Sequence, residues 1–201
     1  DFGTSGQLKR ECATEIAATL AFSAIQNNDK IGVIFFSDYI EKYIAPKKGR
    51  KHILYLIREM LTFTPNSKRT DVGVSLEYLN KVMKRRCTAF VISDFYTRKD
   101  FSQELRIANK KHDVVAIQIY DPRAKEMPDV GLMKVVDAET GHEMYIDTHD
   151  ARLRKVHNKY WEEREIRLHE MLSQSHVDSV AIATDDDYVK MLMTLFSKRN
   201  R

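Results

Sequence analysis

Two kinds of hydrophobic pattern alternate along the chain. Residues 9–25 carry apolar side chains at steps of three and four, which predicts an amphipathic helix. Residues 31–36 are almost purely apolar, which is typical of a strand buried on both faces. The first pattern predicts further helices at 52–61, 72–83, 101–110, 150–173 and 188–196. The second predicts further strands at 88–92, 114–120 and 177–183, and a short edge strand is expected at Glu41–Ile44, ended by Pro46 and Gly49.

Strands that alternate with helices in this way favour an α/β fold. We expect one domain over residues 1–201, with a three-layer α/β/α, Rossmann-like arrangement around a mostly parallel sheet. The core strands of that sheet are expected at Ile31–Phe36, Ala89–Ile92, Val114–Ile119 and Val177–Ile182.

A β-hairpin is predicted as an addition to this core. Leu132–Val136 and Glu143–Ile146 are short segments with strand-forming residues on either side of a polar stretch. Residues 139–141 supply the turn, because Gly141 adopts a positive φ without strain.

The composition is that of an ordinary globular domain. The 201 residues are 43% hydrophobic and 31% charged, with 7 Gly and 4 Pro, which excludes collagen-like and intrinsically disordered chains. No apolar run reaches the ~20 residues that a membrane span needs. Cys12 and Cys87 lie within apolar patterns, which predicts reduced thiols in a cytoplasmic protein. The net charge of +4 comes from basic and acidic residues mixed along the chain, which argues against a nucleic-acid partner.

Motifs of several enzyme classes are absent from the sequence. The chain has neither the phosphate-binding loop Gly-x-x-x-x-Gly-Lys-Ser/Thr nor Gly-x-Gly-x-x-Gly after a strand. Residues 73–77 resemble a nucleophile elbow, but they lack its second glycine and lie in a predicted helix. The seven histidines have no metal-ligand spacing with one another or with the cysteines, so we expect no zinc site.

Oxygen-bearing side chains gather instead at the carboxyl ends of the predicted strands, where parallel sheets place their sites. Thr70 precedes a helix and Asp94 follows a buried strand, and their hydroxyl and carboxylate oxygens suit Mg²⁺ or Mn²⁺. The alternative is structural, with Thr70 as a helix cap and Asp94 as an acceptor that orders its loop. A rim that contacts a protein partner is expected at Ser37, Asp38, Asp71 and Phe95.

Several stretches taken together resemble a bacterial family. They are residues 9–25, 28–37 (NDKIGVIFFS), 45–49 (APKKG), 69–73 (RTDVG), 90–95 (FVISDF), 111–116 (KHDVVA), 128–132 (PDVGL) and 137–141 (DAETG). Over about residues 1–150 the chain is similar to domain-of-unknown-function family 58, a branch with a von Willebrand factor A-like fold.

This resemblance implies a metal-ion-dependent adhesion site. Such a site takes an Asp-x-Ser-x-Ser loop after the first strand, a Thr before a later helix and an Asp after the fourth strand. Thr70 and Asp94 match the second and third of these elements. No apolar strand precedes the similar-looking residues 1–5 (DFGTS). We therefore expect the first strand and its loop to lie upstream of Asp1, and Mg²⁺ or Mn²⁺ to be absent from this fragment.

Two classes of function follow. The first is a non-catalytic protein-binding module, for which the resemblance implies a MoxR-type AAA+ ATPase as the partner. The second is a metal-assisted hydrolase that uses the strand-end aspartates Asp38, Asp94 or Asp121. The hydrolase would need a general base or a second ligand cluster, and the sequence pattern indicates neither.

Overall fold

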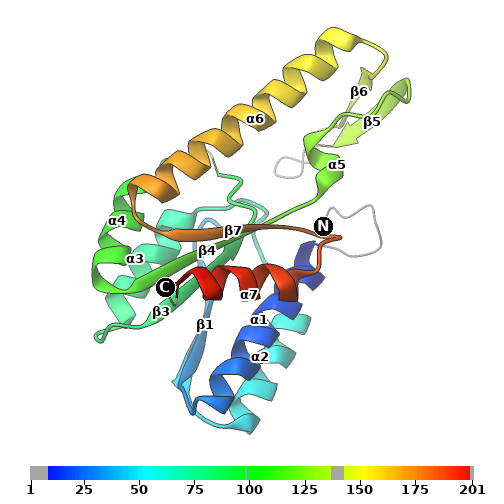
Figure 1. The fold of residues 1–201 in the computed structure, drawn as a ribbon. Helices are drawn as coiled ribbons and strands as arrows, with labels where there is room; N and C mark the ends of the chain where they lie inside the picture. The colour runs from blue at the N-terminus through cyan, green and yellow to red at the C-terminus, as the bar shows by residue number, and fades with distance from the viewer. Residues whose placement is uncertain (1–8, 98, 137–142, 200–201) are drawn as a thin grey trace.

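The computed structural model describes residues 9–97, 99–136 and 143–199 (Figure 1). The helices are α1 (Lys9–Gln26), α2 (Arg50–Thr62), α3 (Val72–Val82), α4 (Ser102–Lys111), α5 (Pro122–Lys125), α6 (Ala151–Gln174) and α7 (Tyr188–Arg199). The strands are β1 (Ile31–Phe36), β2 (Ile40–Lys47), β3 (Thr88–Ser93), β4 (Asp113–Tyr120), β5 (Leu132–Val136), β6 (Glu143–Asp147) and β7 (Asp178–Ala183). Apart from the one-turn helix α5, the sequence predicts each of these elements to within a few residues.

The centre of the molecule is a parallel sheet with the strand order β3–β4–β7. β4 pairs with β3 on one side and with β7 on the other. Ala116 of β4 lies opposite Val91 of β3, and Ile117 of β4 lies opposite Val180 of β7. Its residues 114–119 are all buried. A continuous apolar run therefore has the outcome expected for a strand covered on both faces.

Helices cover both faces of this sheet, which confirms the predicted α/β layering. On one face, Ile16 of α1 and Leu192 of α7 pack with Ile117 of β4. On the other face, Leu105 of α4 and Leu172 of α6 pack with the alternate side chains of the same strand. Because neighbouring residues of a strand point to opposite faces, β4 contributes to both halves of the core.

Ile31–Phe36 forms a strand, as predicted, but the prediction that this strand belongs to the parallel sheet is wrong. This segment, β1, pairs antiparallel with β2 in a separate two-stranded ladder. Gly32 permits the close approach of the two strands, because a Cβ atom there would lie 2.6 Å from the carbonyl oxygen of Ile44. In the described part of the chain, β1 has a ladder partner on one side only, and all six of its residues are half-buried.

Helix packing nevertheless links the two groups of strands. α3 contacts β1, β2 and α4, while α1 contacts β3, β4 and α2. Phe36 at the end of β1 packs against the core cluster that includes Val72 of α3 and Val91 of β3. The β1–β2 ladder is therefore held beside the parallel sheet by side-chain packing and not by strand hydrogen bonds.

The predicted hairpin is confirmed. β5 and β6 pair antiparallel, with Lys134 opposite Tyr145, and Figure 1 shows them beside the N-terminal half of α6. The buried Thr148 fixes the base of the hairpin, since its backbone N–H and its hydroxyl both donate to the carbonyl of Gly131. The predicted turn at residues 139–141 lies outside the described residues.

None of the helices in the described ranges is long and apolar enough to cross a membrane.

Candidate functional site

The predicted site residues lie along the seam between the two groups of strands. Ser37 and Asp38 follow β1, Thr70 and Asp71 precede α3, and Asp94 follows β3. A backbone hydrogen bond of 2.8 Å from the Asp71 N–H to the Ser37 carbonyl joins the end of β1 to the start of α3. The structure therefore brings Ser37 and its neighbour Asp38 close to Asp71, although β1 does not belong to the parallel sheet.

Asp71 is a structural residue with an ion-pair partner. Its side chain is only 7% exposed, and its Oδ1 atom accepts from the Val74 N–H at 3.3 Å, which caps α3. Its Oδ2 atom lies 2.6 Å from the Nζ atom of Lys99, a residue of the segment that follows β3. This hydrogen bond raises the pKa of Lys99 and keeps its ammonium charged beside the carboxylate.

Asp94 is also engaged by a cation. Its Oδ2 atom lies 3.2 Å from the Nζ atom of Lys9 in α1, and its Oδ1 atom accepts from the Tyr96 N–H at 3.0 Å. The backbone carbonyl of Asp94 accepts from Arg164 of α6 at 2.8 Å, and the Arg164 guanidinium lies over the Tyr96 ring. Helices at both faces of the sheet therefore hold the loop in which Asp94 lies.

Phe95 does not belong to the exposed rim, which corrects the prediction. Its backbone has a φ of 52°, and this left-handed conformation turns the ring inward. The ring is 4% exposed and stacks on Phe101 at a centroid distance of 6.1 Å within the core. Phe95 stabilises the loop after β3 and presents no surface to a partner.

Glu41 of β2 is the centre of a hydrogen-bond network that sequence analysis does not predict. Its Oε1 atom accepts from the Ser37 hydroxyl at 2.9 Å and from the Asn66 N–H at 2.9 Å, and Ser67 donates a third bond. Although partial burial raises the pKa of Glu41, the bonds from these three residues outweigh it and lower the pKa. No local pattern links Glu41 to a loop 25 residues later, so no sequence signal was available.

Asp38 lies at the edge of this network. A hydrogen bond with the Ser67 side chain lowers the pKa of Asp38, and Ser37 and the Arg69 charge act in the same direction. The Ser37 hydroxyl lies 3.4 Å from the Oδ1 atom of Asp38. Asp38 is therefore a half-buried carboxylate that stays ionised at neutral pH.

The donor atoms of the seam do not form a metal site by themselves. Thr70 offers a hydroxyl from a half-buried position, and Asp94 offers a carboxylate with an ammonium already beside it. Among the residues that the structure describes, no three His, Cys, Asp or Glu side chains converge as metal ligands. Asp121, the third strand-end aspartate, is buried and caps α5 through the Arg123 N–H at 2.9 Å. The predicted pair Thr70 and Asp94 thus fits a cation only if further ligands join it.

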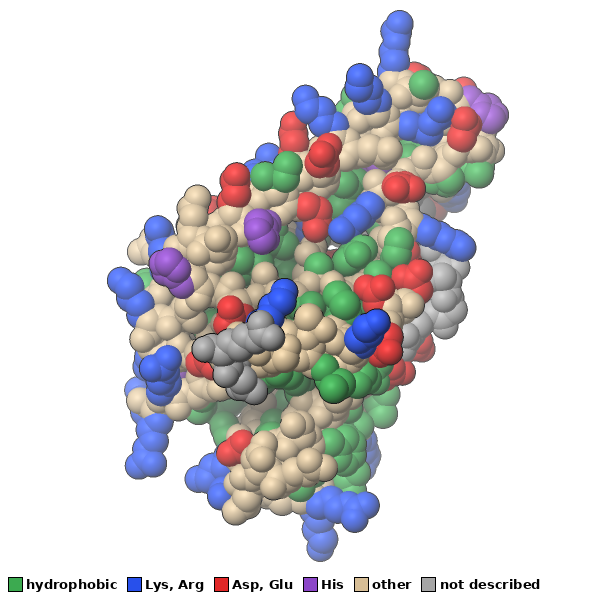
Figure 2. Space-filling view, viewed as in Figure 1, with side chains coloured by type: hydrophobic (Ala, Val, Ile, Leu, Met, Phe, Trp, Pro, Cys, Tyr) green, Lys and Arg blue, Asp and Glu red, His purple; other side chains and the backbone are tan. Residues whose placement is uncertain are grey.

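The surface charge near these elements is mixed. Figure 2 shows Lys and Arg side chains scattered over the visible face, with Asp and Glu between them. A nucleic-acid interface gathers basic residues into one stripe or patch. This face lacks such a gathering.

Two solved structures resemble this fold. The conserved hypothetical protein BatB from Bacteroides thetaiotaomicron has a TM-score of 0.58 and 14% identity, covering 94% of this chain and 87% of that one. An aerotolerance-related membrane protein from Bacteroides fragilis has a TM-score of 0.58 and 13% identity, covering 93% and 88%. At such low identity the likeness shows a shared fold alone.

The sequence relatives are bacterial. Uncharacterized proteins of Mycobacterium bovis and Mycobacterium tuberculosis are each 32% identical over 143 residues. These matches cover 70% of this chain and 45% of each relative, so the chain spans about half the length of the curated relatives it matches. The family described as protein of unknown function DUF58 matches residues 1–166, and the chain therefore belongs to this family.

Proposed function

We propose that this chain is a non-catalytic protein-binding module whose binding surface is the seam between β1 and β3. One observation carries the proposal: the acidic groups of the seam already have partners. Asp71 pairs with Lys99, Asp94 pairs with Lys9, and Glu41 accepts four hydrogen bonds from Ser37, Asn66 and Ser67. A general base needs a carboxylate that is free to accept a proton from a substrate. A surface of fixed, mutually paired charges is better suited to contact another protein.

The von Willebrand factor A-like architecture is part of this proposal. Within the described residues, β1 and β3 each have one side without a ladder partner, and the helices α1, α2 and α3 together pack on both groups of strands. A further parallel strand between β1 and β3 would join them into one sheet. Its carboxyl end would then reach the seam, beside Thr70 and Asp94.

Metal binding is part of the proposal only for a protein that contains this added strand. Thr70 and Asp94 supply two of the oxygen ligands that Mg²⁺ or Mn²⁺ prefers, and a serine-rich loop after the added strand would supply more. Without that loop the described residues do not suffice. The binding proposal for residues 1–201 therefore rests on protein contacts and not on a metal.

The partner that we propose is a MoxR-type AAA+ ATPase. The support is that the chain belongs to the DUF58 family, because its resemblance to this family implies such an ATPase as the partner. Because the chain spans about half the length of its relatives, the partner belongs to the proposal for the whole protein.

The test is a binding titration of the full-length protein against the ATPase. We expect the double variant Asp38→Ala/Lys99→Ala to weaken binding about tenfold, as for groups at the centre of an interface. Lys155→Ala, an exposed change on α6, is the matched control and should have no effect. Equal affinity of all three proteins would refute the seam as the binding surface.

A chelator and a hydrolase screen separate the remaining alternatives. If EDTA weakens ATPase binding without unfolding the protein, the metal takes part in the interface. If binding is unchanged, the metal proposal fails while the binding surface stands. Metal-dependent hydrolysis that disappears in Asp94→Ala would replace the binding module with the hydrolase.

A further inference from the structure

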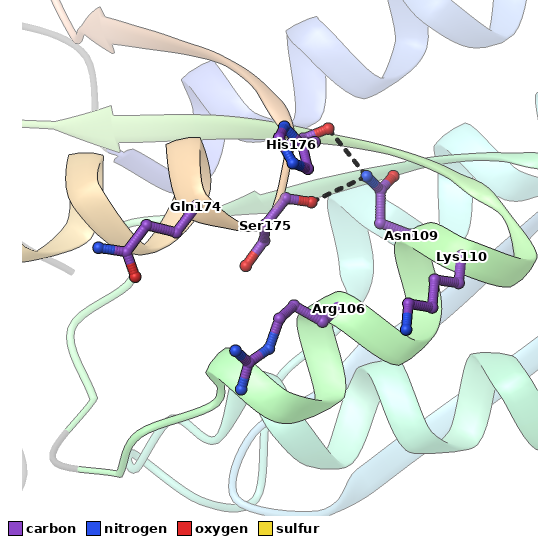
Figure 3. Close-up of a pocket in the computed structure, with 6 residues that line it drawn as sticks. All are labelled: Arg106, Asn109, Lys110, Gln174, Ser175 and His176. Carbon is purple, nitrogen blue, oxygen red and sulfur yellow. Dashed lines mark hydrogen bonds between the residues drawn. The ribbon is translucent and has the colours of Figure 1, made fainter.

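A shallow basic hollow lies at the edge of the sheet opposite the seam. It is formed where α4 ends before β4 and where α6 ends before β7. Figure 3 shows one wall from α4, with Arg106, Asn109 and Lys110, and the other wall from residues 174–176. None of the described residues that line it is acidic.

The cationic side chains of the hollow are available to a ligand. Arg106, Lys110 and His176 are exposed, and the structure gives their side chains no hydrogen bond or ion pair with any described residue. Asp100 is close enough to feel the charge of Arg106, but its carboxylate accepts from the Ser102 N–H at 2.9 Å and the Ser102 hydroxyl at 3.2 Å. The Arg106 guanidinium therefore keeps its donors free.

A polar group at the floor of the hollow also lacks a partner. Ser175 is 6% exposed, yet its hydroxyl makes no hydrogen bond to any described residue. Figure 3 shows this hydroxyl directed toward the side on which Arg106 lies. The Asn109 amide holds the wall in place, because it donates to the carbonyls of Ser175 at 3.1 Å and His176 at 2.8 Å. The hydroxyl is thus aimed into the hollow by a fixed backbone.

The charges of Arg106 and Lys110 exceed what the neighbouring helix ends require. Carbonyl groups in the last turn of α6 already accept backbone hydrogen bonds. The Met171 carbonyl accepts from the Ser175 N–H, and the Leu172 carbonyl accepts from the Val177 N–H. At the end of α4, the Ala108 carbonyl accepts from the His112 N–H. Lysines near a helix C-terminus do favour the helix dipole. The dipole does not account for an arginine one turn earlier, or for a serine hydroxyl that points the same way.

We propose that this hollow binds the phosphate group of a phosphomonoester. An arginine fork matches two phosphate oxygens, while a lysine adds a point charge and a serine hydroxyl a further donor. The hollow is open, and no Phe, Tyr or Trp lines it in the described structure. A phosphate on an exposed side chain of another protein, or free inorganic phosphate, carries the chemistry that these residues recognise.

The test is a titration of the intact protein followed by amide NMR. The probes are inorganic phosphate and a phosphoserine peptide, with sodium chloride at equal ionic strength as the control. We expect saturable shifts at residues 106–110 and 174–176 with both phosphates and none with chloride. Tighter binding of the peptide assigns the ligand to a phosphorylated protein, and equal binding assigns it to free phosphate.

Variants of exposed residues make the result decisive. Arg106→Gln/Lys110→Gln should weaken phosphate binding at least about tenfold, since each removes a charge-assisted hydrogen bond. Ser175→Ala should weaken it less, and Arg152→Gln/Lys155→Gln on the exposed start of α6 is the charge-matched control. Equal phosphate affinity in the wild type and Arg106→Gln/Lys110→Gln, or the same shifts with chloride, would overturn the proposal.

Discussion

β4 and β1 are both mainly apolar strands, but their surroundings are very different. β4 pairs on both sides, and its residues 114–119 are buried. Among the described strands β1 pairs with β2 alone, and each of its six residues is half-buried. Hydrophobic residues thus identify a strand without specifying how many neighbours it has. The difference also places the candidate site, because the seam lies where the well-paired sheet meets the partly paired ladder.

The difference in packing between β4 and β1 is tested most strongly by truncating an isoleucine in each strand. Ile117→Ala in β4 removes a side chain with 0% exposure and leaves a cavity between β4 and the helices α1 and α7. We expect a loss of about 3–5 kcal/mol in the free energy of unfolding. Ile34→Ala in β1 removes a half-buried side chain and should cost only about 1–2 kcal/mol.

Urea denaturation of the two variants measures the difference directly. The comparison holds if Ile117→Ala is the more damaging change by at least about 1 kcal/mol. Equal losses would mean that β1 is as fully packed as the central strand.

The element types were predictable because their signals are local. The run at 114–120 and the helical spacing at 9–25 correspond to β4 and α1 within one residue. Strand pairing is not local, and the prediction of β1 as a sheet member failed for that reason. The one-turn helix α5 was missed because four residues are too few to show a helical period.

The second prediction concerns the capped start of α3 in the seam. Asp71→Ala removes the oxygen that accepts from the Val74 N–H, so we expect a loss of about 1–2 kcal/mol in the free energy of unfolding. Thr70→Ala is the neighbouring control, since no hydrogen bond from the Thr70 hydroxyl links it to other described residues. It should change stability by less than about 0.5 kcal/mol. A larger loss for Thr70→Ala than for Asp71→Ala would show that the cap has been assigned to the wrong residue.

The third prediction is a smaller, pH-dependent difference between the two regions. Burial lowers the pKa of His112, which precedes β4, below its ordinary value of 6.5, and the Lys111 charge acts in the same direction. The unfolded state therefore binds the proton more tightly, and stability falls as the pH drops below about 6.5. The pKa of Glu41 in the β1–β2 ladder is lowered from 4.5, so its contribution is complete above that pH and is lost below it.

Thermal denaturation across pH 3–8 tests this order. His112→Asn should flatten the profile between pH 5 and 6.5, and Glu41→Gln should flatten it below pH 4.5. If Glu41→Gln altered the upper window instead, the two titrations would be assigned to the wrong regions.

The site was predictable only in part, for a related reason. Ser37, Asp38 and Asp71 were found because strand ends and helix starts follow simple rules of position. The lysines that neutralise the site come from distant segments, Lys9 from α1 and Lys99 from the loop after β3. The inward turn of Phe95 depends on a positive φ at a non-glycine residue, and sequence patterns rarely predict such a conformation.

The seam is tested most directly as a protein-binding surface by the hydrogen-exchange footprint of a MoxR-type ATPase on the full-length protein. Amide exchange is compared with and without the ATPase at saturating concentration. We expect slower exchange at residues 37–41, 66–71, 94–97 and 99, which line the seam, and unchanged exchange in β5 and β6 and at residues 174–176. Protection confined to the hairpin, or absent from all three seam segments, would contradict the seam as the protein-binding surface.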